Sequence, residues 1–192
     1  MTNLILASGS EIRYKLLRQS GLKFTVVKSG VNERDIQVSD TKDLSLVLAK
    51  VKALDVANKN CGALVIGCDQ TLEFDGKVIH KAKDITEAKQ RLLQFSGKVH
   101  YLHSSLALAK DNKIIWDLTK TTTLKMRDLS ESNIDNFLAK SGDILSSVGC
   151  YKIEDLGISL FEYIKGNYHD IMGLPLLELL CKLRTLGIDG LL

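Results

Sequence analysis

The sequence predicts a mixed α/β protein in which helices pack around a central sheet. Short apolar runs alternate with segments whose apolar residues recur every three or four positions, which is typical of strands followed by helices. Turn signals at Asp75-Gly76 and at 110–113 add antiparallel hairpins to this order. The chain has 192 residues and neither internal repeats nor a Pro/Gly-rich linker, so we expect one domain over 1–192.

The expected strands are runs of apolar and β-branched residues between polar loops or glycines. The run at 64–67 is continuously apolar, which is typical of a central strand, and it ends just before Asp69. Segments 28–41 and 148–157 are expected to be loops. In chain order, the expected strands span 4–7, 24–27, 64–67, 71–74, 77–79, 99–109, 114–126 and 158–161.

The expected helices are bounded by capping and stop signals. Asp84 and Ser130 precede apolar-periodic segments as N-caps, and glycines such as Gly97 follow these segments as stops. The only proline, Pro175, is expected at the first position of the last helix. The helices are expected over about 11–20, 43–58, 85–95, 131–140 and 175–186.

Charge and composition exclude several classes of protein. The 26 basic and 23 acidic residues give a net charge of +3 and are scattered along the chain, and aromatic residues make up only 6%. A nucleic-acid partner is therefore not expected. No segment approaches the roughly 20 apolar residues of a membrane-spanning helix, and the N-terminus lacks a basic signal-peptide region. We therefore expect no membrane partner and a cytoplasmic location.

Two segments after expected strands contain residues suited to phosphate chemistry. Ser8, Ser10 and Arg13 lie where a strand turns into a helix, so free N–H groups and the helix dipole can bind an anion there. Alternatively, Ser10 only caps the helix and Arg13 points to water. Asp69, at the end of a buried strand, can hold a divalent cation or orient a water molecule, or it can simply form an Asx turn.

A third candidate is the charged segment 80–84 that follows the hairpin. Lys81 in this segment can neutralise a phosphate, whereas the alternative is an ordinary solvated loop. The sequence contains no GxxxxGK[ST], GxGxxG, HExxH or GxSxG motif. The P-loop, dinucleotide-binding, zinc-protease and serine-hydrolase classes are therefore not expected.

Three segments in register resemble the Maf family of septum-formation-inhibitor-like nucleotide pyrophosphatases. LILASGSEIRYKLL is similar to the family's LASxSPRRxxLL, and VIGCDQTLEFDGKVIHKAKD is similar to its IGxDxxxxxDGxxxxKPxD. GCYKIEDLGISLFEYIKGNYHDIMGLPL is similar to its GxYxxxGxGxxLxxxIxGxxxxxxGLPL. The match extends over nearly the whole chain, from about 4 to 186.

The resemblance implies an elongated, inosine-triphosphatase-like mixed α/β fold with two lobes around a cleft, in a cytoplasmic homodimer. It implies hydrolysis of a nucleoside triphosphate to the monophosphate and pyrophosphate, assisted by Mg²⁺ or Mn²⁺. Water must attack the α-phosphorus while charge builds on the departing pyrophosphate, so the site needs an anion near the water and cations on the phosphates.

The resemblance also assigns roles to individual residues. Asp69 would accept the proton from water and, with Glu33, hold the metal. The remaining catalytic residues would be Lys81 and Glu154, and the substrate-binding residues would be Ser8, Ser10, Arg13, Lys52, Gln70 and Lys152.

Departures from the family pattern leave open what the substrate is and whether the protein is active. Glu11 and Ile12 stand where the family usually has proline and arginine, so one cation is missing. Gln70, Lys152 and Glu154 favour the family branch associated with 7-methyl-GTP, or alternatively a less characterised paralogue. One alternative is a catalytically weak nucleotide-binding regulator of cell division. The other is a domain whose motifs are only caps and turns.

Overall fold

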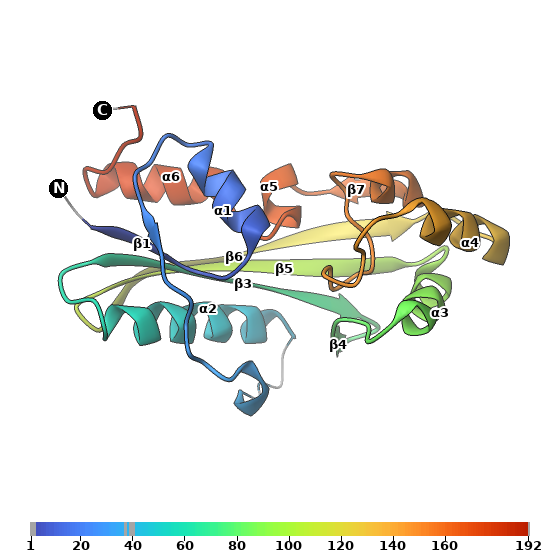
Figure 1. Ribbon diagram of the computed structural model, residues 1–192, viewed down its shortest axis with the longest axis horizontal. Helices are drawn as coiled ribbons and strands as arrows, with labels where there is room; N and C mark the ends of the chain where they lie inside the picture. The colour runs from blue at the N-terminus through green and yellow to red at the C-terminus, as the bar shows by residue number, and fades with distance from the viewer. Residues whose placement is uncertain (1–2, 37, 39–40, 192) are drawn as a thin grey trace. The chain divides into compact units, whose positions relative to one another are not determined.

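A seven-stranded mixed sheet forms the centre of the protein, as a computed structural model of the chain shows (Figure 1). The structure describes residues 3–36, 38 and 41–191. The strand order is β2-β1-β3-β5-β6-β7, and β4 pairs with β3 outside this path. Strand β1 is parallel to β2 and β3, whereas β4 is antiparallel to β3 and β7 to β6. The predicted mixed α/β class is confirmed.

The chain divides into two compact units, and three of the boundaries fall inside strands of the sheet. Unit 1 contains the described residues up to Gln70, His103–Thr121 and those from Asn167 onward. Unit 2 contains Thr71–Leu102 and Thr122–Gly166. The expectation of one domain over the whole chain stays a prediction. No helix in the described part of the chain is long and apolar enough to span a membrane.

Unit 1 has helices on both faces of its strands. Helix α2 covers one face, and α1 and α6 cover the other (Figure 1). The elements that begin in unit 1 are β1 (Leu4–Ala7), α1 (Glu11–Arg18), β2 (Thr25–Val26), the 3-10 helix η1 (Glu33–Asp35), α2 (Thr41–Ala57), β3 (Leu64–Phe74), β6 (Lys113–Met126), α5 (Tyr168–Ile171) and α6 (Leu176–Thr185).

Unit 2 contains the ends of the long strands, two helices and a short hairpin. Asp75 and Gly76 both have positive φ, as the tight β3–β4 turn requires, so this predicted hairpin is confirmed. The elements that begin in unit 2 are β4 (Lys77–Ile79), α3 (Ile85–Phe95), β5 (Val99–Lys110), α4 (Glu131–Lys140), the 3-10 helix η2 (Leu156–Leu160) and β7 (Phe161–Lys165).

A core of small residues lets α2 approach the sheet closely. Ala49 and Ala53 of α2 pack with buried residues of β1, β3 and β5. A Cβ added to Gly67 would lie 2.1 Å from the carbonyl oxygen of Ala49 and 2.7 Å from the Cβ of Ala53, so only glycine fits there. This approach places Lys52, which lies between these two alanines on α2, beside Asp69 of β3.

Three sequence-based boundaries are wrong. Strand β3 does not stop at 67 but continues through Asp69 to Phe74, because a buried counterion from α2 compensates the carboxylate. Residues 156–160 form a 3-10 helix and the strand begins at Phe161, so the strand expected over 158–161 is displaced. Pro175 is the N-cap of α6 and not its first residue, because its ψ of 75° is not helical although its φ of −63° is.

Candidate active site

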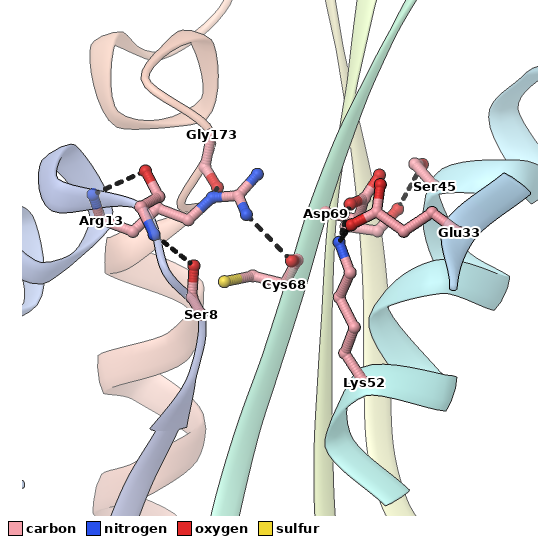
Figure 2. Close-up of polar contacts among 10 residues, drawn as sticks. Ser8, Arg13, Glu33, Ser45, Lys52, Cys68, Asp69 and Gly173 are labelled. Carbon is pink, nitrogen blue, oxygen red and sulfur yellow. Dashed lines mark hydrogen bonds and ion pairs between the residues drawn. The ribbon is translucent and has the colours of Figure 1, made fainter. Parts of the chain in front are cut away.

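Strand β3 places Asp69 on the face of the sheet that α2 covers. Successive side chains of a strand point to opposite faces, so Cys68 and Asp69 diverge (Figure 2). Asp69 is only 7% exposed. Burying an unpaired carboxylate carries a large energetic cost, so this position requires a cation or hydrogen-bond donors nearby.

Lys52 supplies that cation and joins two carboxylates. Its Nζ lies 2.5 Å from Oδ1 of Asp69 and 2.6 Å from Oε1 of Glu33. Lys52 is 8% exposed, whereas the side chain of Glu33, in η1, is 55% exposed. The three residues therefore form a chain of charges that leads from the core toward solvent (Figure 2).

The pKa values of Lys52 and Asp69 reflect burial and mutual attraction. Burial raises the pKa of Asp69 above its ordinary value, although the charges of Lys52 and Arg13 oppose this. Burial also lowers the pKa of Lys52, but the charges and hydrogen bonds of Asp69 and Glu33 outweigh it and leave that pKa raised. Lys52 therefore stays protonated, and Asp69 is a stronger base than an ordinary exposed carboxylate.

Arg13 lies on the other side of β3 and holds main-chain carbonyls (Figure 2). Its Nε donates to the carbonyl oxygen of Gly173 at 2.8 Å, and its Nη1 donates to that of Cys68 at 3.0 Å. Because a guanidinium has five N–H groups, it retains donors for an anion after these two bonds. Arg13 thus connects α1 to β3 and to the turn before α6. The alternative of an arginine that points to water is therefore wrong.

Ser8 and Ser10 organise the turn from β1 into α1. Ser10 is the N-cap, and its hydroxyl accepts a hydrogen bond from the main-chain N–H of Arg13. The hydroxyl of Ser8 accepts one from the main-chain N–H of Ser10. The capping role considered for Ser10 is confirmed, whereas phosphate binding by both serines stays a prediction.

Gln70 is tied to the segment before α6 by its side-chain amide. Its Nε2 donates to the hydroxyl of Ser104 at 2.8 Å and to the carbonyl oxygens of Asp170 and Ile171 at 3.2 and 2.9 Å. The hydroxyl of Ser104 also donates to the carbonyl oxygen of Asp170. No local pattern indicates Ser104 or Asp170 as partners, because they lie 34 and 100 residues from Gln70.

The other predicted site residues belong to unit 2. Lys81 and Glu154 are exposed, and among described residues neither forms a salt bridge. Lys152 lies 3.7 Å from a carboxylate oxygen of Asp143. The structure thus brings together Glu33, Lys52 and Asp69 within unit 1, and it places Lys81, Lys152 and Glu154 in unit 2.

A buried histidine anchors the loop that carries Lys152. His100 Nε2 lies 2.7 Å from the hydroxyl of Tyr151, and both residues are buried. Burial lowers the pKa of His100 from 6.5 to about 4, so the folded state holds its ring neutral. The unfolded chain binds a proton to this ring at a higher pH than the folded protein does.

We therefore expect His100 to make stability depend on pH. Its contribution is complete above pH 6.5 and is lost as the pH falls toward 4. It amounts to about 3 kcal/mol between about pH 8 and about pH 4. Urea unfolding at several pH values should show a steeper acid loss for the wild type than for His100→Gln. Equal slopes would contradict this account.

Glu33, Lys52 and Asp69 form a cluster whose two carboxylates fit a hard divalent cation. Mg²⁺ usually binds one or two carboxylates and completes its shell with water and substrate phosphates. Glu33 and Asp69 are two such carboxylates, and both meet at the ammonium of Lys52. Among the described residues, no group of three or more His, Cys, Asp or Glu side chains forms a complete protein-only site.

Comparison with known proteins finds relatives that are pyrophosphatases by name. A 7-methyl-GTP pyrophosphatase from Brucella suis is 44% identical over 97% of this chain and 98% of that protein. One from Bartonella henselae is 47% identical over the same shares, and a nucleoside triphosphate pyrophosphatase from Maricaulis maris is 40% identical over 98% of both chains. A solved HAM1 protein from Coxiella burnetii aligns with 66% of this chain and 73% of its own, at 18% identity and a TM-score of 0.44, a likeness too distant to support an argument. The Maf-like protein family matches residues 3–186, and the chain belongs to this family.

Proposed function

We propose that the protein hydrolyses nucleoside triphosphates to the monophosphate and pyrophosphate. The observation that carries this proposal is the buried, Lys52-bound carboxylate of Asp69, which occupies the aspartate position of the family's IGxD motif. Relatives with 40% to 47% identity over nearly their whole length are pyrophosphatases by name. Membership of the family and the chemistry of the cluster therefore support the same activity.

Asp69 acts as the general base in the proposed reaction. A water oxygen forms a bond to the α-phosphorus, its proton passes to the carboxylate of Asp69, and the bond from the α-phosphorus to the bridging oxygen breaks. The electron pair of that bond leaves with the pyrophosphate. A carboxylate whose pKa is raised by burial accepts the proton more readily than an exposed one.

The cations of unit 1 stabilise the charge that develops on the phosphates. Lys52 is held protonated by Asp69 and Glu33, and Arg13 keeps guanidinium donors beyond the two that bind carbonyls. Charge stabilisation of this kind supplies much of the catalysis of phosphoryl-group chemistry. That Lys81, Lys152 and Glu154 act on the substrate stays a prediction.

Glu33 and Asp69 would hold the divalent metal, together with phosphate oxygens of the substrate. The metal would supply Lewis-acid stabilisation of the phosphates. We expect activity with Mg²⁺ or Mn²⁺ to be abolished by excess EDTA and restored when the metal is added back. Full activity in EDTA-treated protein and metal-free buffer would contradict the assignment.

We also propose that the preferred substrate is 7-methyl-GTP. Gln70, Lys152 and Glu154 follow the motif of that branch, and relatives from Brucella suis and Bartonella henselae are 7-methyl-GTP pyrophosphatases by name. The test is pyrophosphate release from a panel of standard and methylated triphosphates. The expected result is the highest kcat/KM for 7-methyl-GTP, whereas a higher value for an unmodified triphosphate would overturn this preference.

Two observations favour a second candidate, a nucleotide-binding regulator of cell division. Ile12 replaces the family's usual second arginine, and two donors of Arg13 already bind main-chain carbonyls. Calorimetric binding of a triphosphate without any pyrophosphate release across the panel would select this candidate. Release with turnover would select the enzyme.

The family resemblance supports a homodimer in the cytoplasm, and we propose both. Light scattering of the purified protein should give twice the 21.3 kDa chain mass. A monomeric mass at the concentration used for the activity assay would contradict the dimer.

A further inference from the structure

Helix α3 joins two segments of unit 2 that carry predicted site residues. The segment 80–84 contains Lys81, and the loop 148–155 contains Lys152 and Glu154. Between them lies Arg91 of α3, which is only 8% exposed and has no role in the proposed chemistry. A guanidinium at such a position must find partners for its donors, because burial without partners is costly.

The two terminal nitrogens of Arg91 contact different parts of unit 2. Its Nη1 donates to the carbonyl oxygen of Val148 at 2.8 Å and lies 3.7 Å from the sulfur of Cys150, so it holds the start of the loop. Its Nη2 donates to Oε1 of Glu87, one turn earlier on α3, at 3.0 Å. The planar fork of arginine allows both sets of contacts at once, which the single ammonium of lysine cannot reproduce.

Glu87 extends the connection to the segment that carries Lys81. Its second oxygen, Oε2, accepts a hydrogen bond from the main-chain N–H of Lys83 at 3.0 Å. A second link runs directly between the two segments, since the main-chain N–H of Ala82 donates to the sulfur of Cys150. The segment 80–84 and the loop 148–155 are thus joined twice, once through Glu87 and Arg91 and once through Cys150.

The loop held by Arg91 has a narrowly defined conformation. Cys150 has φ of +59°, which is uncommon for a residue with a side chain. A Cβ on Gly149 would lie 2.3 Å from Cε1 of Tyr151, so only glycine fits there. Tyr151 is fixed in turn by its hydrogen bond to His100. A strained loop of this kind persists only where the surrounding structure determines it.

We propose that Glu87 and Arg91 are positioning residues, which hold the Lys81 segment and the Lys152–Glu154 loop in one fixed relation. This inference rests on the proposed function, because it assumes that Lys81 and Glu154 serve the reaction. Neither Glu87 nor Arg91 is expected to touch the substrate. Both act through the main chain of the segments that they hold.

Hydrogen exchange tests the connection without relying on activity. In Arg91→Lys, amides of both 81–84 and 148–152 should exchange about two- to tenfold faster, as expected for the loss of single hydrogen bonds. Glu87→Gln can keep only one of its two acceptor contacts, and because Glu87 is partly exposed this variant is expected to fold. It should affect 81–84 while Val148 stays bound to Arg91.

Lys89→Ala is the matched control on the same helix. It removes salt bridges of Lys89 to Glu131 and Asp135 that do not involve either segment. We expect its exchange in 81–84 and 148–152 to equal that of the wild type. Unchanged exchange in Arg91→Lys, or the same acceleration in Lys89→Ala, would overturn the proposed connection.

Kinetics tests whether the connection serves the reaction. Arg91→Lys should lower kcat/KM by about tenfold or more, since misplacing a group by about 1 Å can cost about 100-fold. In a background that carries both Lys81→Ala and Glu154→Ala the same substitution should cost much less, because the two groups that it positions for the reaction are gone. Equal losses in both backgrounds would overturn the positioning role. A wild type without activity would refute the proposed function, while the exchange result would still decide the connection.

Discussion

Replacing Asp69 by asparagine is expected to lower kcat by about 1,000-fold or more, because it removes the base that accepts the proton from water. Asparagine has the same shape but cannot take up that proton, and it is a poorer ligand for a hard cation. The fold should survive, since Lys52 keeps its ion pair with Glu33 at 2.6 Å. Pyrophosphate release under single-turnover conditions measures the effect on the chemical step.

The matched control for this substitution is Asp55→Asn. Asp55 also binds a lysine of the same region, Lys59, with 2.6 Å between Nζ and Oδ1, but Asp55 is only half-buried and Lys59 is exposed. The other oxygen of Asp55 accepts a hydrogen bond from the main-chain N–H of Gly30, which the amide oxygen of asparagine can keep. Surface ion pairs contribute only about 0–1 kcal/mol, so we expect full activity and nearly unchanged stability. If Asp69→Asn retained wild-type kcat with every triphosphate tested, Asp69 could not be the base.

The substitution Lys52→Met is expected to cause a large loss of stability, roughly 3 kcal/mol, as is usual when one partner of a buried ion pair is removed. It leaves two carboxylates without their shared cation, and Asp69 is only 7% exposed. Burial already raises the pKa of Asp69, and loss of the opposing charge of Lys52 raises it further. Denaturant unfolding of the variant and the wild type at neutral pH measures this loss.

A double substitution separates the ion pair from packing. Removing Lys52 should cost more than removing Asp69, because Lys52 has two carboxylate partners, whereas Asp69 has one ammonium partner among the described residues, at 2.5 Å. Lys52→Met with Asp69→Asn should therefore be more stable than Lys52→Met alone. Additive losses would show that the buried pair contributes no coupling energy.

The fold class and the hairpins could be predicted because their signals are local. Strands β5 and β6 follow long runs of apolar and β-branched residues, and the turn between them has positive φ at Asp111 and Asn112, which both tolerate it. The continuation of β3 through Asp69 could not be predicted in this way. It depends on Lys52, 17 residues earlier, which pairs with Asp69 only after α2 packs on the sheet.

The residues of the candidate site could be predicted better than the contacts that they make. The family pattern identified Arg13, but nothing local indicates that its partner is Gly173, 160 residues away. Arg91 was missed, although its spacing offered a signal. It lies three residues after Ala88 and four before Phe95, so it falls on the buried face of α3, where an arginine needs partners.

The most direct test of the central claim is hydrolysis of a triphosphate in water labelled with heavy oxygen (H₂¹⁸O), followed by mass spectrometry of both products. Attack at the α-phosphorus, with Asp69 as the base, predicts that the label enters the nucleoside monophosphate and that the pyrophosphate stays unlabelled. Label in the pyrophosphate, or release of labelled orthophosphate with a nucleoside diphosphate, would contradict the account.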